Sequence, residues 1–353
     1  MTDSTRGFGA PVAMPVAVPV APPSPLDPRA TAESVLFEIR RVIVGQDQML
    51  ERVLVALLAG GHLLLEGVPG LAKTLTIRTL ADALDASFRR IQFTPDLVPG
   101  DLVGTRIYRA DSGTFDTELG PVFCNFLLAD EINRAPAKVQ SALLEVMQER
   151  QVTIGGETFR VPDPFLVMAT QNPIETDGTY PLPEAQVDRF MMKVLVDYPS
   201  EAEEFVIVQR MTGAMAAVAP VASTEQILLL RSSCEEVFVD PLLVQHAVRL
   251  AAATRTPEQH GVADVARYIV YGASPRASIN LIIAARALAF VRGRTYVIPQ
   301  DVTDMVHDVM RHRIIPSYEA LSDGVTNDAI LEKVMKAIPA PAQPLQSHAR
   351  AAS

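Results

Sequence analysis

The first stretch with residue types and spacing suited to chemistry is a glycine-rich loop between an apolar run and a helical pattern. It matches the phosphate-binding pattern G-x-x-x-x-G-K-[ST] except at Ala72, which stands where the second glycine belongs. We expect Ala72 to adopt the right-handed geometry of a helix start, which alanine tolerates. The alternative is a plain turn between a strand and a helix. The loop consists of Gly67, Val68, Pro69, Gly70, Leu71, Ala72, Lys73 and Thr74.

Such a loop binds phosphate through its backbone N–H groups, and the helix N-terminus that follows faces the anion. Lys73 would reach the β- and γ-phosphates of ATP. The hydroxyl of Thr74 would bind Mg²⁺. The loop therefore predicts ATP and Mg²⁺ as cofactors.

Two adjacent carboxylates, Asp130 and Glu131, directly follow the apolar residues 126–129. Two acids at the end of a buried strand are costly unless a cation or a proton neutralises them. Beside a phosphate loop that cation is Mg²⁺, which Asp130 would hold. Glu131 would orient and deprotonate an attacking water. The alternative is that Glu131 is only an acid in the first turn of the next helix.

Two further polar residues lie at the ends of predicted elements, one after a strand and one at the start of a helix. Asn172 comes after the apolar residues 165–169, where it could hydrogen-bond the water or the γ-phosphate; it could equally be a turn residue before Pro173. Arg276 lies in the first turn of a helix opened by Ser274 and Pro275. A cation there opposes the helix dipole at a cost of about 0.3–1 kcal/mol, so an anion within reach explains it better.

The elements that must position these residues are short, fully apolar strands at 63–65, 125–129 and 165–169. Strands buried on both faces indicate a parallel sheet flanked by helices, and ligands of such sheets bind at the carboxyl ends of the strands. The phosphate loop, Asp130 with Glu131, and Asn172 all follow such ends. The sequence therefore predicts an α/β fold with one site.

Two hairpins interrupt this core, with turns at residues 111–113 and 155–156. On the residues alone, surface decoration is at least as good an explanation for them as function. After about residue 199 helical patterns replace strands, which predicts a small all-α domain. We therefore expect an α/β core at 30–199, a helical domain at 200–337, and disordered tails at 1–29 and 338–353.

Composition and charge disfavour several classes of function and location for this protein. The chain has 353 residues and a net charge of −10, without a dense basic run, which disfavours a nucleic-acid partner. No membrane span is expected, and the prolines near the N-terminus forbid a helical signal-peptide core. Cys124 and Cys234 lack metal spacing and are expected to be small apolar fillers. A reducing, cytoplasmic location fits.

Five motifs in order resemble the MoxR-type AAA+ ATPases of the helix-2-insert clade. Besides the phosphate loop they are LLADEINR at 127–134, ATQNP at 169–173, LPEAQVDRF at 182–190 and SPRA at 274–277. The resemblance covers roughly residues 33–335 and includes the alanine of the loop. It implies Walker A for the loop and Walker B for Asp130 and Glu131. It further implies sensor 1 for Asn172, the arginine finger for Arg189, sensor 2 for Arg276, and contact with the adenine for Val44 and Gly45.

The resemblance also implies an AAA+ P-loop NTPase core with a lid domain, and an ATPase that works as a ring, most often a hexamer. Its members act as chaperones on protein clients or in metal-cofactor maturation, often with a von Willebrand factor A-domain partner. The hairpins would be the two inserts of the clade. Arg189 would point at a neighbour's γ-phosphate; the alternative is a surface ion pair with Asp188 or Glu184. Three other functions stay open: a switch controlled by ATP occupancy, a nucleic-acid motor and a small-molecule kinase.

Overall fold

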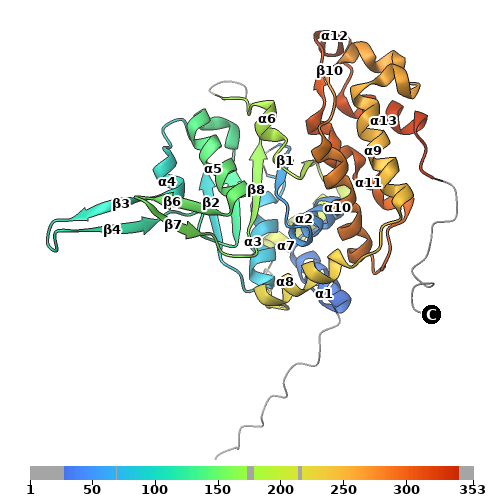
Figure 1. The fold of residues 1–353 in the computed structure, drawn as a ribbon. Coiled ribbons are helices and arrows are strands. Elements are labelled where there is room, and N and C mark those ends of the chain that lie inside the picture. Colours follow the sequence, from blue (N-terminus) through green and yellow to red (C-terminus); the bar gives the residue numbers. More distant parts are fainter. Residues whose placement is uncertain (1–27, 69, 173–178, 214–216, 342–353) are drawn as a thin grey trace, which may run out of the picture.

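The computed structural model describes residues 28–68, 70–172, 179–213 and 217–341. An α/β core with protruding β-hairpins forms one side of the molecule, and a mostly helical part packs against its other side (Figure 1). The predicted tails fall mainly outside the described residues. At their inner ends, helix α1 (Pro28–Val42) already begins at Pro28, and Ile338 is still buried.

The core sheet has five parallel strands in the order β2-β5-β8-β1-β9. Its register pairs Leu65 with Thr170 and Ala129 with Ala169, so the central strands end at one edge of the sheet. The parallel sheet predicted from the apolar runs is thus confirmed. The strand bounds are β1 (Leu63–Glu66), β2 (Phe88–Gln92), β5 (Phe126–Asp130), β8 (Leu166–Gln171) and β9 (Met192–Leu195).

Both faces of this sheet are buried at its central strands, which explains why β1, β5 and β8 are largely apolar. In β1, Leu63 and Leu65 pack into one hydrophobic cluster and Leu64 packs into another on the opposite face. Helices α2 (Asp47–Leu58) and α3 (Lys73–Ala83) contribute to the first cluster. Helix α5 (Ala137–Glu149) contributes to the second.

The two predicted hairpins are present. The first consists of β3 (Gly104–Arg109) and β4 (Thr114–Leu119), preceded by the short helix α4 (Pro99–Val103). The second consists of β6 (Gln151–Ile154) and β7 (Glu157–Arg160). They touch each other, because Nη1 of Arg106 donates to the carbonyl of Gly155 at 3.3 Å. Both project from the core on the side away from the helical part (Figure 1).

The second part, which we call the lid, is mainly helical, as predicted. Asp240 caps one of its helices by accepting a hydrogen bond of 2.8 Å from Leu242 N, and Ser274 caps another by accepting one of 3.2 Å from Arg276 N. Its helices are α9 (Pro241–Arg255), α10 (Pro275–Val291), α11 (Pro299–Met310), α12 (Tyr318–Ser322) and α13 (Asn327–Ala337), with the 3₁₀ helices η2 (Pro257–His260), η3 (Ala263–Tyr268) and η4 (Arg311–Arg313). Helices α7 (Glu201–Thr212) and α8 (Thr224–Glu235) precede it in the chain and lie against α1 of the core (Figure 1).

The lid also contains one short strand pair that the sequence did not indicate, in which β10 (Ile269–Tyr271) and β11 (Ile315–Pro316) pair antiparallel. Strands of two and three residues are too short to show a period-two pattern in the sequence, and their partners are far apart along the chain.

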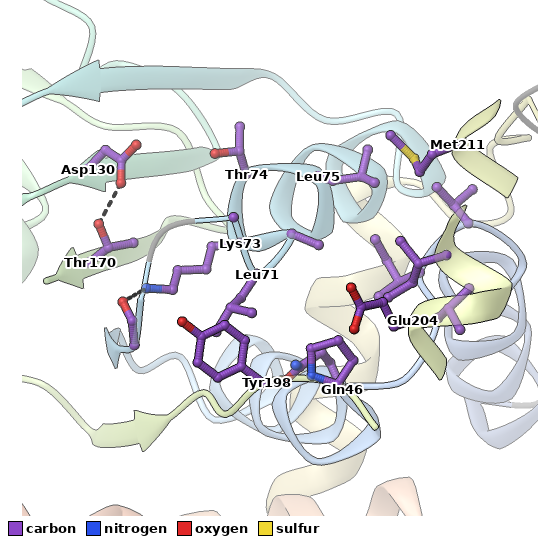
Figure 2. Close-up of a pocket in the computed structure, with 18 of the residues that line it drawn as sticks. Gln46, Leu71, Lys73, Thr74, Leu75, Asp130, Thr170, Tyr198, Glu204 and Met211 are labelled. Atoms are coloured by element: carbon purple, nitrogen blue, oxygen red, sulfur yellow. Dashed lines mark hydrogen bonds between the residues drawn. The ribbon is translucent and has the colours of Figure 1, made fainter. Parts of the chain in front are cut away.

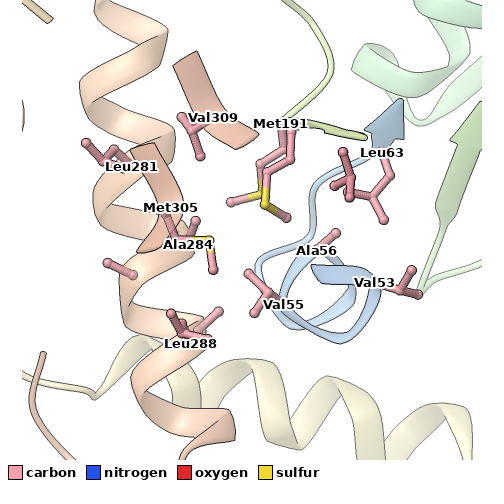
Figure 3. Close-up of a cluster of buried hydrophobic side chains, with 14 of the residues drawn as sticks. Val53, Val55, Ala56, Leu63, Met191, Leu281, Ala284, Leu288, Met305 and Val309 are labelled. Atoms are coloured by element: carbon pink, nitrogen blue, oxygen red, sulfur yellow. The ribbon is translucent and has the colours of Figure 1, made fainter. Parts of the chain in front are cut away.

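The lid and the core share a hydrophobic cluster. Figure 3 shows α2 side chains, including Val55, facing Leu281 and Leu288 of α10 and Met305 of α11. Met191, just before β9, lies between them and Leu63. The lid therefore rests on α2 and on the edge of the sheet that β9 forms.

None of the helices within the described ranges is both long and apolar enough to span a bilayer. Cys124 and Cys234 are both buried, and desolvation raises the pKa of each thiol to about 12. Such thiols are unreactive at neutral pH, which agrees with the predicted role as apolar fillers.

Candidate functional site

A cavity of about 690 Å³ lies at the carboxyl ends of β1, β5 and β8, where the sequence predicts the site. This volume is within the usual range for small-molecule sites. The phosphate loop, both carboxylates and Asn172 line it, so the structure brings these predicted residues together. The lining residues of the loop are Gly67, Gly70, Leu71, Ala72, Lys73 and Thr74, whereas Val68 is not among them and Pro69 lies outside the described residues.

The backbone of the loop differs from the prediction at one residue. Ala72 has φ 56° and ψ 16°, in the left-handed region, instead of the right-handed geometry expected of a helix start. A residue with a Cβ is strained there by roughly 1–2 kcal/mol, which is why the pattern prefers glycine at this position. Gly67 has a different reason to be glycine, since a Cβ on it would lie 2.5 Å from the carbonyl of Val196.

Lys73 begins helix α3 and extends along the inside of the loop (Figure 2). Its ammonium donates a hydrogen bond of 2.5 Å to the carbonyl of Gly67. Burial lowers the pKa of Lys73, while the carboxylates of Asp130, Glu66 and Glu131 oppose that shift. A half-buried cation in a loop of this shape is a binding group for phosphate.

Asp130 ends strand β5 and is held from two sides. Its Oδ1 accepts a hydrogen bond of 2.6 Å from Thr170 Oγ1 (Figure 2), and its Oδ2 accepts one of 2.5 Å from Arg90 Nη2. Figure 2 also shows Thr74 on the side of the loop that faces Asp130. One carboxylate and one hydroxyl form an oxygen donor set that fits Mg²⁺, which keeps waters and takes further ligands from substrate phosphates.

Glu131 has a left-handed backbone, with φ 55°, and precedes the short 3₁₀ helix η1 (Ile132–Arg134). Its side chain makes no capping hydrogen bond to that helix, which argues against the helix-start interpretation. Instead its Oε2 accepts 2.8 Å from Gln92 Nε2 and lies 3.1 Å from Arg134 Nε. The carboxylate is thus held at the cavity wall by groups from β2 and η1.

Sequence reasoning missed Arg90, Gln92 and Thr170, which fix the two carboxylates. Arg90 and Gln92 are two residues apart on β2 and therefore share a face of the strand. That spacing is visible in the sequence, but its meaning depends on β2 lying next to β5, which the sequence does not reveal.

The far end of the cavity is mostly apolar and combines residues of the phosphate loop and α3 with residues of α7. Leu71 and Leu75 from the core face Ile207 and Met211 of α7. This surface suits a nucleobase, and Tyr198, Glu204 and Gln46 also project toward it (Figure 2). Of the two residues predicted to contact the adenine, Val44 lines the cavity and Gly45 does not.

Helix α7 is tied to the core beside this end of the cavity. Nη1 of Arg210 donates to the carbonyl of Arg41 at 2.9 Å and to that of Arg40 at 3.2 Å. The cavity wall therefore includes helix α7, whose position relative to α1 is fixed by these hydrogen bonds. Its contribution could not be inferred from the sequence, because α7 follows the phosphate loop by more than a hundred residues.

Arg189 and Arg276 do not line this cavity. They lie together on another one of about 170 Å³, beside His62 and Asn280. Arg276, predicted to bind the cofactor as sensor 2, lies 3.4 Å from Oδ2 of Asp188. Asp188 also accepts from Ser274 Oγ at 3.1 Å, so this carboxylate is the anion that offsets the cation at the start of α10.

The comparisons with known proteins agree with this geometry. The family described as "ATPase family associated with various cellular activities (AAA)" matches residues 62–192, and an AAA lid domain matches residues 261–334. The chain is 57% identical to the chaperone MoxR1 of Mycobacterium tuberculosis over 321 residues, 90% of this chain and 85% of that protein. It is 35% identical to the protein MoxR of Paracoccus denitrificans over 321 residues, 85% of this chain and 94% of that protein.

A solved structure is also similar over nearly its whole length. This crystal structure, assigned as an ATPase of Cytophaga hutchinsonii, superposes with a TM-score of 0.84 at 48% sequence identity. The match covers 89% of this chain and 96% of that one. The arrangement of core and lid is therefore that of a known ATPase fold.

Proposed function

This chain belongs to the MoxR-type AAA+ ATPases, and we propose that it is a ring-forming remodelling ATPase whose nucleotide site is completed by a neighbouring copy. Nucleotide binding and ATP hydrolysis come with the family. The observation that carries the shared site is the separation of two groups. Lys73, Asp130 and Glu131 line the nucleotide cavity, whereas Arg189 and Arg276 lie together on a different one.

The cavity residues have distinct roles in this proposal. Lys73 and the loop N–H groups bind the phosphates, and Thr74 with Asp130 would hold Mg²⁺, which neutralises charge on the phosphates when bound. Glu131 accepts the proton of the attacking water, and Gln92 keeps its carboxylate in place before ATP arrives. Asn172 at the end of β8 positions the water or the γ-phosphate.

The two arginines complete the site from outside. Phosphoryl transfer needs a cation against the developing charge, and the described residues that line the cavity include three, Lys73, Arg90 and Arg210. Arg210 donates to the carbonyls of α1 instead. Arg90 is already engaged by Asp130. Arg189 and Arg276, half-exposed or exposed on a separate face, are suited to the nucleotide of the next subunit. A hexamer is the ring we propose.

The biological role is proposed from the family. Action on protein clients is supported by the name of one relative, chaperone MoxR1. A role in metal-cofactor maturation, a von Willebrand factor A-domain partner and a cytoplasmic location are proposed from the motif resemblance alone. The protruding hairpins are the surfaces we assign to the client.

The experiment that tests the site compares ATP binding and turnover in three full-length variants. Lys73→Ala should lose ATP binding, because it removes the charge on the β- and γ-phosphates. Glu131→Gln should bind ATP like wild type and lose turnover by about 10²–10⁴-fold, because an amide cannot accept the proton. Asp130→Asn should weaken both binding and its Mg²⁺ dependence. Wild-type affinity in Lys73→Ala, or wild-type turnover in Glu131→Gln, would contradict the assignment.

A further inference from the structure

Three consecutive side chains of η4 in the lid hydrogen-bond to the segment that carries Arg189. Nη1 of Arg311 donates to the carbonyl of Lys193 at 2.8 Å. The ring of His312 lies 3.1 Å from the carbonyl of Phe190. Arg313 adds further bonds to the same segment. These acceptors run from just before Arg189 to the start of the edge strand β9, so one turn of the lid fixes the backbone around Arg189.

Arg313 makes the central contacts. Its side chain is 0% exposed, and its Nε donates 2.8 Å to Oδ1 of Asp188. Its Nη2 donates 2.6 Å to the carbonyl of Phe190 and 3.2 Å to that of Asp188, and its Nη1 donates 3.1 Å to that of Met191. The guanidinium therefore holds the chain immediately before and immediately after Arg189.

Stability alone is a poor explanation for this buried cation. Replacing a buried ion pair by apolar residues of similar volume is often neutral or stabilising, because desolvation offsets the attraction. What a planar guanidinium with five donors supplies is a fixed geometry for its acceptors. Burial lowers the pKa of Arg313 to about 10, with Asp188 opposing the shift, so it remains charged at neutral pH.

Asp188 also connects Arg313 to the start of helix α10. Besides Arg313, it accepts from Ser274 Oγ at 3.1 Å and lies 3.4 Å from Arg276 Nη1. Arg189 and Arg276 are thus connected to the same lid element through one carboxylate. We propose that Arg313 is a positioning residue that couples the lid to Arg189, so that the position of the lid sets the position of the arginine offered to the neighbouring subunit. This inference rests on the shared site proposed above.

The chain offers a matched control in a second buried pair between lid and core. Arg52 of α2 donates 2.6 Å to Oδ2 of Asp308 in α11, and the two side chains are 5% and 1% exposed. Neither residue contacts the segment around Arg189 directly. Asp308 also accepts 2.8 Å from Nη1 of Arg311 through its other oxygen, and Arg52→Gln leaves that bond in place. A purely structural role for Arg313 predicts that Arg313→Gln and Arg52→Gln behave alike, whereas a positioning role predicts that they differ.

The test measures kcat, ATP affinity and thermal stability of full-length Arg313→Gln, Arg52→Gln and Asp188→Asn, each with and without Arg189→Ala. A displaced catalytic arginine should lower kcat about 10²-fold in Arg313→Gln, with ATP Kd within about twofold of wild type. The double variant with Arg189→Ala should be no slower than Arg189→Ala alone, because both changes remove the same contribution. Arg52→Gln should keep kcat within about threefold of wild type, and its effect should multiply with that of Arg189→Ala.

Wild-type kcat in a folded Arg313→Gln, or losses that multiply with Arg189→Ala, would overturn the proposal. If Arg313→Gln does not fold, the isosteric Asp188→Asn takes its place in the same cycle, and failure of both to fold would make the pair a folding element and refute the positioning role. If Arg189→Ala itself turns over ATP like wild type, the shared site is wrong. This outcome is distinct from failure of the Arg313 proposal, because it does not depend on any Arg313 variant.

Discussion

The hydroxyl of Thr170 donates a hydrogen bond of 2.6 Å to Oδ1 of Asp130. The hydroxyl oxygen of Thr170 also accepts a hydrogen bond of 2.9 Å from the backbone N–H of Glu131. One side chain on β8 therefore orients both consecutive acids at the end of β5. This makes Thr170 the link between the group assigned to Mg²⁺ and the group assigned to the attacking water.

We therefore predict that Thr170→Val impairs hydrolysis more than binding. Valine keeps the branched shape but leaves the Glu131 N–H without its acceptor and frees one oxygen of Asp130, at a cost of about 1–3 kcal/mol in stability. Turnover should fall at least about tenfold, and the Mg²⁺ concentration for half-maximal rate should rise. Thr170→Ser, which retains the hydroxyl, is the control. Equal kinetics for the two variants would show that the hydrogen bond does not matter.

The left-handed Ala72 leads to a prediction about stability. Glycine has no steric strain at φ 56°, whereas alanine does. Glycine also loses more backbone entropy than alanine on folding, so the two effects on stability partly cancel. Ala72→Gly should be more stable than wild type by about 0.5–1 kcal/mol and should bind ATP with unchanged affinity. Chemical denaturation of both proteins measures this difference. A destabilised Ala72→Gly would mean that the loop does not keep this backbone in solution.

The hairpins lead to a prediction about clients. The first hairpin exposes Tyr108 and Phe115, whose side chains form a cross-strand aromatic pair with ring centroids 5.2 Å apart. Arg106 joins the two hairpins by donating a hydrogen bond to the carbonyl of Gly155. Replacing either hairpin by a short Gly/Ser link should leave basal ATPase activity within about twofold, because neither hairpin contributes to the nucleotide cavity. Stimulation by a client protein should be lost. Stimulation that survives both replacements would show that the hairpins are decoration.

Much of this molecule could be predicted from local patterns. The strands at Leu63–Glu66 and Phe126–Asp130 are apolar up to their last residue because helices cover both faces of the sheet, and the cap at Asp240 opens its helix as expected. The convergence of Lys73, Asp130 and Asn172 followed from a general rule about strand ends in parallel sheets.

What could not be predicted depends on contacts between distant segments or on exact backbone angles. Gln92 reaches Glu131 only because β2 pairs with β5, and Arg313 reaches Phe190 only because the lid folds back onto β9. The left-handed geometry of Ala72 is invisible in a residue type that usually avoids it. Arg276 was predicted to have an anion within reach, but the sequence did not indicate Asp188 as that anion, because the contact spans 88 positions.

The central claim is that two copies of the chain build each ATPase site, and mixing two inactive variants tests it most directly. Arg189→Ala should bind ATP and assemble like wild type, yet hydrolyse about 10³–10⁵-fold more slowly. Lys73→Ala should not bind ATP, but it still carries an intact Arg189. When the two are mixed and allowed to exchange subunits, some interfaces pair an intact Lys73 with an intact Arg189.

We predict that the mixture regains a measurable fraction of wild-type turnover, with a maximum at intermediate ratios of the two variants. Lys73→Ala mixed with the double variant Lys73→Ala/Arg189→Ala is the control that should stay inactive at every ratio. If the mixture of single variants also stays inactive at every ratio, although subunit exchange is demonstrated, Arg189 does not act on a neighbour and the shared-site account is wrong.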